Sequence, residues 1–251
     1  MHNLVTVTEG DCWSRIRLEK PALGNALCPH LVFSIRAELL NAKKREDRLV
    51  IFEGEGRNFC TGIDLSEIDT LDDQTLLARF CEIELLLSEI WNAPFLTMAV
   101  GKGRVTGAGA DLFTACDLRL SFNDSTFAFP GSSFGLVLGT RRLGIRVGAD
   151  VATRLALSGA YIDARHACEL GLVSKILTPS ALNAEYLEAE EVVRKHTIKT
   201  VAQIKSAALS SYGSGTDNDM AALVKSASAA GLKNRILRYR DKVKKIKKIS
   251  E

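Results

Sequence analysis

The sequence predicts an α/β fold, because strand-like and helix-like segments alternate along most of the chain. Short apolar or alternating runs, typical of strands, are separated by longer runs whose apolar residues recur at helical spacing. Two glycine-containing turns each lie between a strand-like run and a helical pattern. The 251 residues suffice for one α/β domain with a substantial core, or for one such domain with a small helical addition.

The first part of the chain contains a predicted hairpin, a helix and a third strand. Residues 4–8 and 13–18 alternate with period two around a Glu-Gly-Asp turn, which predicts a β-hairpin, and Pro21 ends its second strand. Residues 31–42 carry apolar side chains on one helical face. The continuously apolar run at 49–52 predicts a buried strand.

The middle of the chain continues this alternation. Residues 76–91 predict a long helix, which Pro94 ends, and residues 95–100 predict the next strand. The further predicted elements are a helix at 112–115, strands at 118–120 and 126–129, helices at 149–157 and 164–170, and a strand at 173–177.

From residue 180 onward the pattern is helical only, with amphipathic runs at 182–193 and 201–209. A serine- and glycine-rich segment at 210–215 interrupts this helical part. We therefore predict a boundary near residue 178, which divides the chain into segments 1–178 and 179–251.

The two glycine-containing turns carry the main functional signal. The first is residues 57–65, Arg-Asn-Phe-Cys-Thr-Gly-Ile-Asp-Leu, and the second is the glycine-dense segment 101–112. Each leaves backbone N–H groups unpaired before a helix, so two amides can point at one oxygen atom. A fixed amide of this kind stabilises a developing oxyanion by about 3–4 kcal/mol. The alternative is that the glycines only make tight strand-to-helix connections.

Four segments, in consistent order from about residue 5 to 176, resemble the enoyl-CoA hydratase/isomerase (crotonase) family. They are Pro21-Ala22-Leu23-Gly24-Asn25-Ala26-Leu27; Phe59-Cys60-Thr61-Gly62-Ile63-Asp64-Leu65; Gly107-Ala108-Gly109 with Cys116-Asp117-Leu118-Arg119-Leu120; and Leu157-Ser158-Gly159 with Ala164 and Gly171-Leu172-Val173. The resemblance implies an α/β, crotonase-like spiral of strand-strand-helix units that binds acyl-CoA. It also implies a C-terminal helical oligomerisation region that packs on a neighbouring subunit, in a homotrimer or homohexamer.

The resemblance implies that an acyl-CoA thioester binds between the two turns. The N–H groups of Ile63 and Ala108 would then hold the thioester oxygen and stabilise an enolate. The CoA moiety would contact Ala22, Leu23, Thr61, Gly62 and Asp64, and the acyl pocket would include Gly107, Pro130, Gly131 and Leu136. In this arrangement the Thr61 carbonyl meets the adenine amino group, and Ala22 and Leu23 flank the bent CoA. For Asp64 we favour a second interpretation, that its side chain caps the next helix.

Hydratases of the family use two glutamates, and this sequence departs from that pattern. Asp111, whose side chain is one methylene shorter, stands at the position of the first glutamate. Gly131, directly after Pro130, stands at the position of the second. Addition of water to a double bond requires one carboxylate as base and another as acid. The sequence therefore retains Asp111 as the principal acid–base residue and lacks its partner. The segment 135–143 is also shorter than its counterpart in the family.

Other side chains are candidates for the missing acid or for anion binding. The candidates for the acid are Ser132 and Ser133 on the same loop, and Glu67, Asp69, Asp72 and Asp73 after the first turn. A surface or capping role is the alternative for each of these residues. Arg104, Arg141 and Arg142 are candidates to meet a substrate carboxylate or a CoA phosphate, and exposure to solvent is the alternative for them.

Composition argues against several other classes of protein. A formal charge of +3 argues against a dedicated nucleic-acid binder. Six cysteines without a C-x-x-C pair indicate reduced thiols, and four histidines without metal-ligand spacing predict no structural zinc. Without a signal-like start or a membrane-length apolar run, we expect a cytoplasmic protein without membrane association. The lysines of the last ten residues predict a solvated helix face, with a phosphate-binding patch as the alternative.

The sequence therefore predicts an acyl-CoA-transforming enzyme, with enoyl-CoA hydratase the nearest named activity. A reaction that needs one carboxylate, such as enoyl-CoA isomerisation or acyl-CoA decarboxylation, is the first alternative. A catalytically degenerate protein that binds CoA esters, a partner or RNA is the second. We expect no permanently bound cofactor, because coenzyme A would arrive as part of the substrate.

Overall fold

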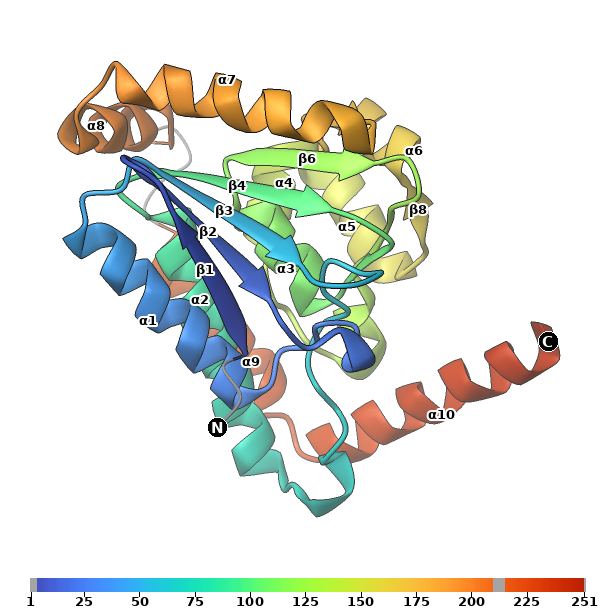
Figure 1. Cartoon of the computed structure of the whole chain (residues 1–251). Helices are drawn as coiled ribbons and strands as arrows, with labels where there is room; N and C mark the ends of the chain where they lie inside the picture. The colour runs from blue at the N-terminus through green and yellow to red at the C-terminus, as the bar shows by residue number, and fades with distance from the viewer. Residues whose placement is uncertain (1–3, 210–214, 251) are drawn as a thin grey trace.

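The computed structural model describes residues 4–209 and 215–250, and it places a six-stranded and a three-stranded sheet beside several helices (Figure 1). The large sheet has the order β1-β2-β3-β4-β6-β9, in which only the first pair is antiparallel. Its strands are β1 (Val5–Glu9), β2 (Trp13–Leu18), β3 (Leu49–Gly54), β4 (Leu96–Gly101), β6 (Leu118–Phe122) and β9 (Lys175–Leu177). The α/β prediction and the hairpin are confirmed.

The small sheet has the order β5-β7-β8. Its strands are β5 (Arg104–Thr106), β7 (Thr126–Ala128) and β8 (Ile162–Asp163). The strand β5 follows directly on β4, so the second glycine turn joins the two sheets. This sheet holds the segment that leads into helix α3 (Ala108–Ala115).

Two layers of helices bury the two faces of the large sheet (Figure 1). Val50 and Phe52 of β3 share a buried cluster with α1 (Pro29–Lys44) and α2 (Asp73–Trp91). Leu49 and Ile51 share another cluster with α7 (Leu182–Arg194). Because side chains alternate across a strand, burial on both faces explains why this run is continuously apolar.

After β9 the described residues form helices only, as predicted. They are η4 (Pro179–Ala181), α7, α8 (Ile198–Leu209), α9 (Thr216–Ala227) and α10 (Leu232–Ser250). The helix α9 packs on α2, whereas α10 contacts the turn η3 (Pro130–Phe134) and then extends away from the rest of the molecule (Figure 1). Most of the break predicted at 210–215 lies outside the described residues.

Several predicted boundaries were wrong. The helix expected at 112–115 begins at Ala108, because Gly107 adopts a positive φ of 55° and turns the chain directly into it. Patterns in 135–147 did not predict helix α4 (Thr140–Val147), and the strand expected at 173–177 begins at Lys175. The remaining elements are η1 (Pro21–Leu23), η2 (Ile68–Thr70), α5 (Ala149–Ser158) and α6 (Ala164–Glu169).

The two glycine turns lie against each other across the junction of the sheets. Cys60 forms a parallel bridge with Val105, and the Thr106 N–H donates to the Cys60 carbonyl at 3.0 Å. Gly109, in the first turn of α3, packs so closely that a Cβ atom there would stand 2.3 Å from the same carbonyl oxygen. Only glycine permits this approach without a shift of backbone.

A comparison of two helical glycines tests this contact. We expect Gly109→Ala to lower the free energy of unfolding by at least about 1–3 kcal/mol, because the added methyl group forces the turns apart. Gly144→Ala, in α4, is the matched control, since its Cβ would meet only Ala152 Cβ at 3.9 Å. That change should be neutral or stabilising by about 0.5–1 kcal/mol. Equal stability of the two variants in urea titrations would contradict the proposed contact.

Candidate active site

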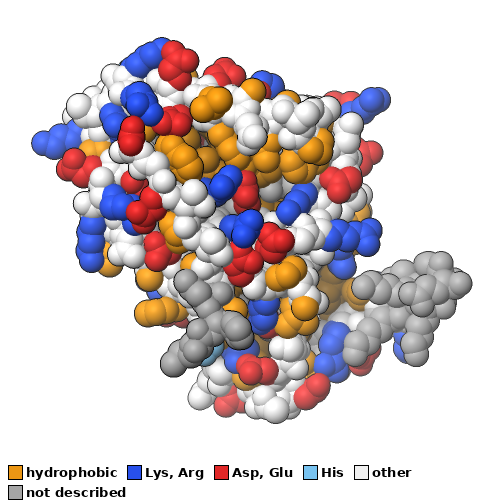
Figure 2. All heavy atoms as spheres, viewed as in Figure 1, with side chains coloured by type: hydrophobic (Ala, Val, Ile, Leu, Met, Phe, Trp, Pro, Cys, Tyr) orange, Lys and Arg blue, Asp and Glu red, His pale blue; other side chains and the backbone are white. Residues whose placement is uncertain are grey.

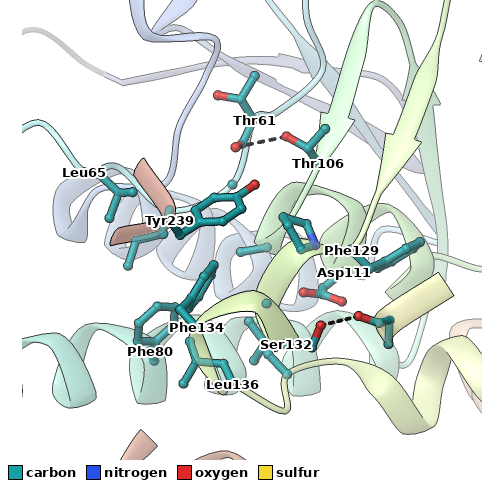
Figure 3. Close-up of a pocket in the computed structure, with 18 of the residues that line it drawn as sticks. Thr61, Leu65, Phe80, Thr106, Asp111, Phe129, Ser132, Phe134, Leu136 and Tyr239 are labelled. Carbon is teal, nitrogen blue, oxygen red and sulfur yellow. Dashed lines mark hydrogen bonds between the residues drawn. The ribbon is translucent and has the colours of Figure 1, made fainter. Parts of the chain in front are cut away.

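A cavity of about 250 Å³ lies between the two glycine turns, the turn η3 and helix α10 (Figure 3). Its wall is mostly apolar, with Phe80, Phe129, Phe134 and Leu136 among the residues that line it. Of the site residues that the resemblance implies, the following line the cavity: Thr61, Gly62, Ile63, Gly107, Ala108, Asp111, Pro130, Gly131 and Leu136. The structure therefore brings together residues from three separate segments of the sequence.

The Ile63 N–H has no hydrogen-bond acceptor among the residues that the structure describes. Leu27 pairs with this segment through two hydrogen bonds. The Leu27 N–H donates to the Gly62 carbonyl at 2.8 Å, and the Leu27 carbonyl accepts a hydrogen bond from the Asp64 N–H at 2.9 Å. Because backbone groups alternate in direction along an extended segment, the Ile63 N–H points away from Leu27. Gly62 allows this geometry with a φ of 100°.

The Ala108 N–H is likewise unpaired within the described part of the chain. Ala108 is the first residue of α3, where the amides of the first turn have no partner in the helix. The neighbouring Gly107 N–H is occupied, since it donates to Ala128 at 2.9 Å. A Cβ atom on Gly62 would lie 3.5 Å from the Ala108 nitrogen, so the two turns present their unpaired amides close together.

Asp111 places a carboxyl group at the cavity wall, one helical turn after Ala108 (Figure 3). The residue is 6% exposed, and its carboxyl packs so tightly on Gly139 that a Cβ there would stand 2.2 Å from Oδ1. Burial raises the pKa of Asp111 well above its usual range, Glu84 raises it further, and the Arg142 guanidinium opposes the shift. Asp111 is the only carboxyl among the described residues that line the cavity.

A buried ion network lies behind this site. Arg142 is fully buried and binds both carboxylate oxygens of Glu84, at 2.6 and 3.1 Å, and also approaches Asp219 at 3.3 Å. Arg141 binds the same Asp219 at 2.8 Å. The network joins α2, α4 and α9, so the hypothesis that Arg141 or Arg142 meets a ligand anion was wrong. The alternative of exposure to solvent was also wrong for Arg142, which is fully buried. Both guanidinium groups are directed toward internal carboxylates rather than toward the cavity.

The position of the second hydratase acid is open. Gly131 lines the cavity and does not have a positive φ, and a Cβ atom there would find only Leu136 at ordinary contact distance, 3.5 Å or more. Ser132 also lines the cavity, but its hydroxyl donates to the Ala156 carbonyl (Figure 3). No side chain in the described part of the cavity replaces the second carboxylate.

The other candidates for that acid lie outside the cavity lining, and the acidic ones have structural partners. Glu67 pairs with Arg79, and Asp69 pairs with Arg240. Asp72 caps α2 by accepting the Thr75 N–H at 2.7 Å, and Asp73 accepts the N–H groups of 231–233 at the start of α10. Ser133 is exposed on η3 and does not line the cavity. Short acidic side chains before helices are used here as caps.

The segments that the resemblance assigned to CoA lie side by side at the surface. Ala22 and Leu23 are exposed, and the Thr61 hydroxyl donates to the Leu23 carbonyl at 3.2 Å. The Thr61 carbonyl accepts a hydrogen bond from the Thr106 hydroxyl at 3.1 Å, as the dashed line in Figure 3 shows. One lone pair of this carbonyl therefore remains for a ligand.

Asp64 does not cap a helix, so that expectation was wrong. Its carboxylate accepts the Ser66 N–H at 2.9 Å and the Lys20 ammonium at 2.5 Å, whereas Asp72 provides the cap of α2. Burial opposes the charge of Asp64, but the hydrogen bonds from Lys20 and Ser66 outweigh it and lower the pKa. The ion pair ties the first turn to the segment that contains Ala22.

Several cavity residues were not predicted from the sequence. Helix α10 contributes Tyr239, Arg240 and Val243, and the Tyr239 ring packs on Phe134 at 5.3 Å between centroids (Figure 3). Tyr161, before β8, also lines the cavity. No local pattern distinguishes these residues from surface positions, because their place in the cavity depends on how distant helices pack.

The described residues contain no cluster of three or more histidine, cysteine, aspartate or glutamate side chains able to hold a metal ion. None of the helices in that same part of the chain is long and apolar enough to span a membrane. The site is therefore built from backbone amides, one buried carboxyl group and an aromatic wall.

Comparisons with known proteins agree with the resemblance. The zebrafish ethylmalonyl-CoA decarboxylase is 32% identical over 141 residues, which cover 54% of this chain and 46% of that protein. The mouse mitochondrial enoyl-CoA hydratase domain-containing protein 3 is 30% identical over 203 residues, which cover 79% of this chain and 68% of that protein.

Solved structures and a family model give the same result. A putative enoyl-CoA hydratase/isomerase from Bordetella parapertussis has a TM-score of 0.91 at 34% identity, covering 94% of this chain and 98% of its own. An enoyl-CoA hydratase from Bacillus halodurans, at 18% identity and a TM-score of 0.82 over 94% of this chain and 99% of its own, shares the fold. Because the model of the enoyl-CoA hydratase/isomerase family matches residues 11–236, the chain belongs to that family.

Proposed function

We propose that this protein binds an acyl-CoA thioester, stabilises its enolate with the N–H groups of Ile63 and Ala108, and isomerises an enoyl-CoA with Asp111. One observation carries the proposal: Asp111 is the only carboxyl group among the described residues of the cavity, and it lies one helical turn from an unpaired amide. The CoA moiety would lie against Ala22, Leu23, Thr61, Gly62 and Asp64.

A single carboxylate is sufficient for this isomerisation. With the thioester oxygen held by two amides, the proton on C2 becomes acidic, and ionised Asp111 removes it to give a dienolate. The same carboxyl group then delivers that proton to C4, so the double bond moves from C3–C4 to C2–C3. No water molecule or second acid takes part, and the enzyme returns to its starting state.

The environment of Asp111 suits this role. A general base works best when its pKa lies near the working pH, and burial raises the pKa of Asp111 in that direction. The apolar wall excludes water, which strengthens the two amide–oxygen hydrogen bonds. Hydration, the nearest named activity, would require a second acid at the place where Gly131 stands.

Decarboxylation is the second candidate, because the raised pKa of Asp111 favours its protonated form, which can donate a proton. A 2-carboxyacyl-CoA would lose CO₂ to leave a thioester enolate, and Asp111 would then protonate C2. The name of the zebrafish relative, ethylmalonyl-CoA decarboxylase, favours this reaction. A protein that only binds CoA esters remains the alternative without catalysis, and cytoplasmic location stays a prediction.

The pH dependence of Asp111 separates these reactions. We expect Asp111→Asn to lower kcat/KM by about 10²–10⁴-fold on 3-hexenoyl-CoA, because proton transfer is lost. For isomerisation, the activity of the natural protein should rise with pH through the raised pKa of Asp111, whereas decarboxylation of a 2-carboxyacyl-CoA should fall.

The fold of this variant is checked separately. Because the folded pKa of Asp111 is raised, its contribution to stability is lost as pH rises, so the variant should melt at an equal or higher temperature at pH 7. Unchanged turnover in a folded Asp111→Asn protein would assign proton transfer to another group. Absence of any product from either substrate would favour the binding-only alternative.

Gly131→Glu tests whether hydration lacks only its second acid. We expect weak hydration of crotonyl-CoA by the natural protein and faster hydration by the variant, since the amides and Asp111 are already in place. The absence of a positive φ and the space around Gly131 favour folding of the variant. Strong hydration by the natural protein, or no gain in a folded variant that binds crotonyl-CoA, would contradict this interpretation.

We also infer a homotrimer or homohexamer, because the C-terminal helices expose apolar side chains. On α7, Leu187 is 66% exposed, and Figure 2 shows hydrophobic side chains gathered below this helix, where it meets the large sheet. Light scattering should return a multiple of the 27.3 kDa chain, and Leu187→Asp should shift it toward a single chain. A single-chain mass for the natural protein at micromolar concentration would exclude stable assembly.

A further inference from the structure

Arg104 lies at the cavity wall and has no role in the reaction proposed above. It is the first residue of β5, where Val105 points into the core and is fully buried. Side chains alternate along a strand, so Arg104 and Thr106 share the opposite face, and both line the cavity. Its backbone is fixed by a hydrogen bond from the Arg104 N–H to Asn58 Oδ1 at 3.0 Å.

Arg104 belongs to a polar cluster with two tyrosines. Its Nη2 donates to the Tyr161 hydroxyl at 2.9 Å, and its guanidinium lies 5.9 Å from the centre of the Tyr161 ring. Tyr239 from α10 lines the same cavity and interacts electrostatically with both Arg104 and Tyr161. The cluster therefore joins β5, the segment before β8 and the C-terminal helix.

The positive charge of Arg104 has no acidic partner among the described residues. No aspartate or glutamate oxygen in that part of the chain lies within 4 Å of it, whereas the other arginine of the cavity, Arg240, pairs with Asp69 at 3.1 Å. Asp111, the only carboxyl group among the described residues that line the cavity, forms no ion pair with it either. A half-buried guanidinium in a mostly apolar wall is therefore balanced best by an anion on the ligand.

The size of the cavity favours an anion on the acyl group. A space of about 250 Å³ accommodates an acyl chain and the thioester. The diphosphate of CoA is separated from the sulfur by the whole pantetheine arm, so it would lie outside this space when the thioester meets Ala108. A planar carboxylate matches the fork of N–H donors that an arginine presents.

We propose that Arg104, together with Tyr161 and Tyr239, binds a carboxylate at the far end of the acyl chain, so that the protein selects thioesters of dicarboxylic acids. This inference rests on the proposed thioester site but not on the reaction that occurs there. Arg104 acts here as a specificity-determining residue, because the carboxylate that it binds is remote from the carbon atoms at which Asp111 moves protons.

Binding of two unreactive ligands tests the proposal. Adipyl-CoA and hexanoyl-CoA have acyl chains of equal length, and only the first carries a terminal carboxylate. Calorimetry on the full chain should show that adipyl-CoA binds about tenfold or more tightly than hexanoyl-CoA, because charge-assisted hydrogen bonds to the terminal carboxylate add to its affinity. Arg104→Met should abolish this preference and leave hexanoyl-CoA affinity within about twofold, because only the carboxylate loses its partner.

A matched control and a shortened ligand distinguish the alternatives. Arg154→Met removes an exposed positive charge of α5 that does not line the cavity, and it should retain the preference. Adipyl-pantetheine lacks the nucleotide phosphates, and the natural protein should still prefer it to hexanoyl-pantetheine. Circular dichroism should show that both variants are folded.

Three outcomes would overturn the proposal. Equal affinity of the natural protein for adipyl-CoA and hexanoyl-CoA would leave the thioester site intact but exclude carboxylate selection. If Arg104→Met lowers the affinity for both CoA esters equally and leaves the affinity for the pantetheine esters unchanged, Arg104 binds a phosphate of CoA instead. Absence of binding by every CoA ester would reject the proposed function itself, and this inference with it.

Discussion

The candidate site depends on the close contact between the two glycine turns. The Cys60 carbonyl accepts the Thr106 N–H, and the backbone of Gly109 packs directly against that same carbonyl group. Any side chain at Gly109 would separate the turns, and with them the unpaired amides of Ile63 and Ala108. Because an oxyanion is stabilised only by donors already in place, the precision of this backbone contact limits what the site can do.

Charge is arranged around the cavity in two different ways. Behind it, Arg141 and Arg142 balance the carboxylates of Glu84 and Asp219, and these ion pairs connect three helices at a cost in desolvation. At the cavity wall, Asp111 has no ion-pair partner and burial raises its pKa, whereas Arg104 donates a hydrogen bond to the neutral hydroxyl group of Tyr161. The buried ions behind the cavity are thus paired with one another, whereas Asp111 and Arg104 at the wall form no ion pair with a described residue.

Local sequence was sufficient for the parts of the site that depend on backbone conformation. The turns at Gly62 and Gly107 were predicted from local sequence, because a strand, a glycine and a helix start specify the direction of the next amides. Asp111 was assigned from the family resemblance. The partners of Arg142 and Asp64 were not predictable in this way, since the sequence does not show which distant carboxylate or ammonium group a side chain reaches. Tyr239 was missed for the same reason.

The position of α10 links the C-terminal helices to the cavity. Asp73 accepts three N–H groups at the start of α10, and Arg235 donates to the Phe134 carbonyl at 2.9 Å. Phe134 belongs to η3, the turn that also carries Gly131, so the docking of α10 and the shape of the cavity are fixed together. The predicted boundary at residue 178 follows the last strand, β9, but the cavity includes residues from both sides of it. An assembly built on the C-terminal helices would therefore act directly on the cavity wall.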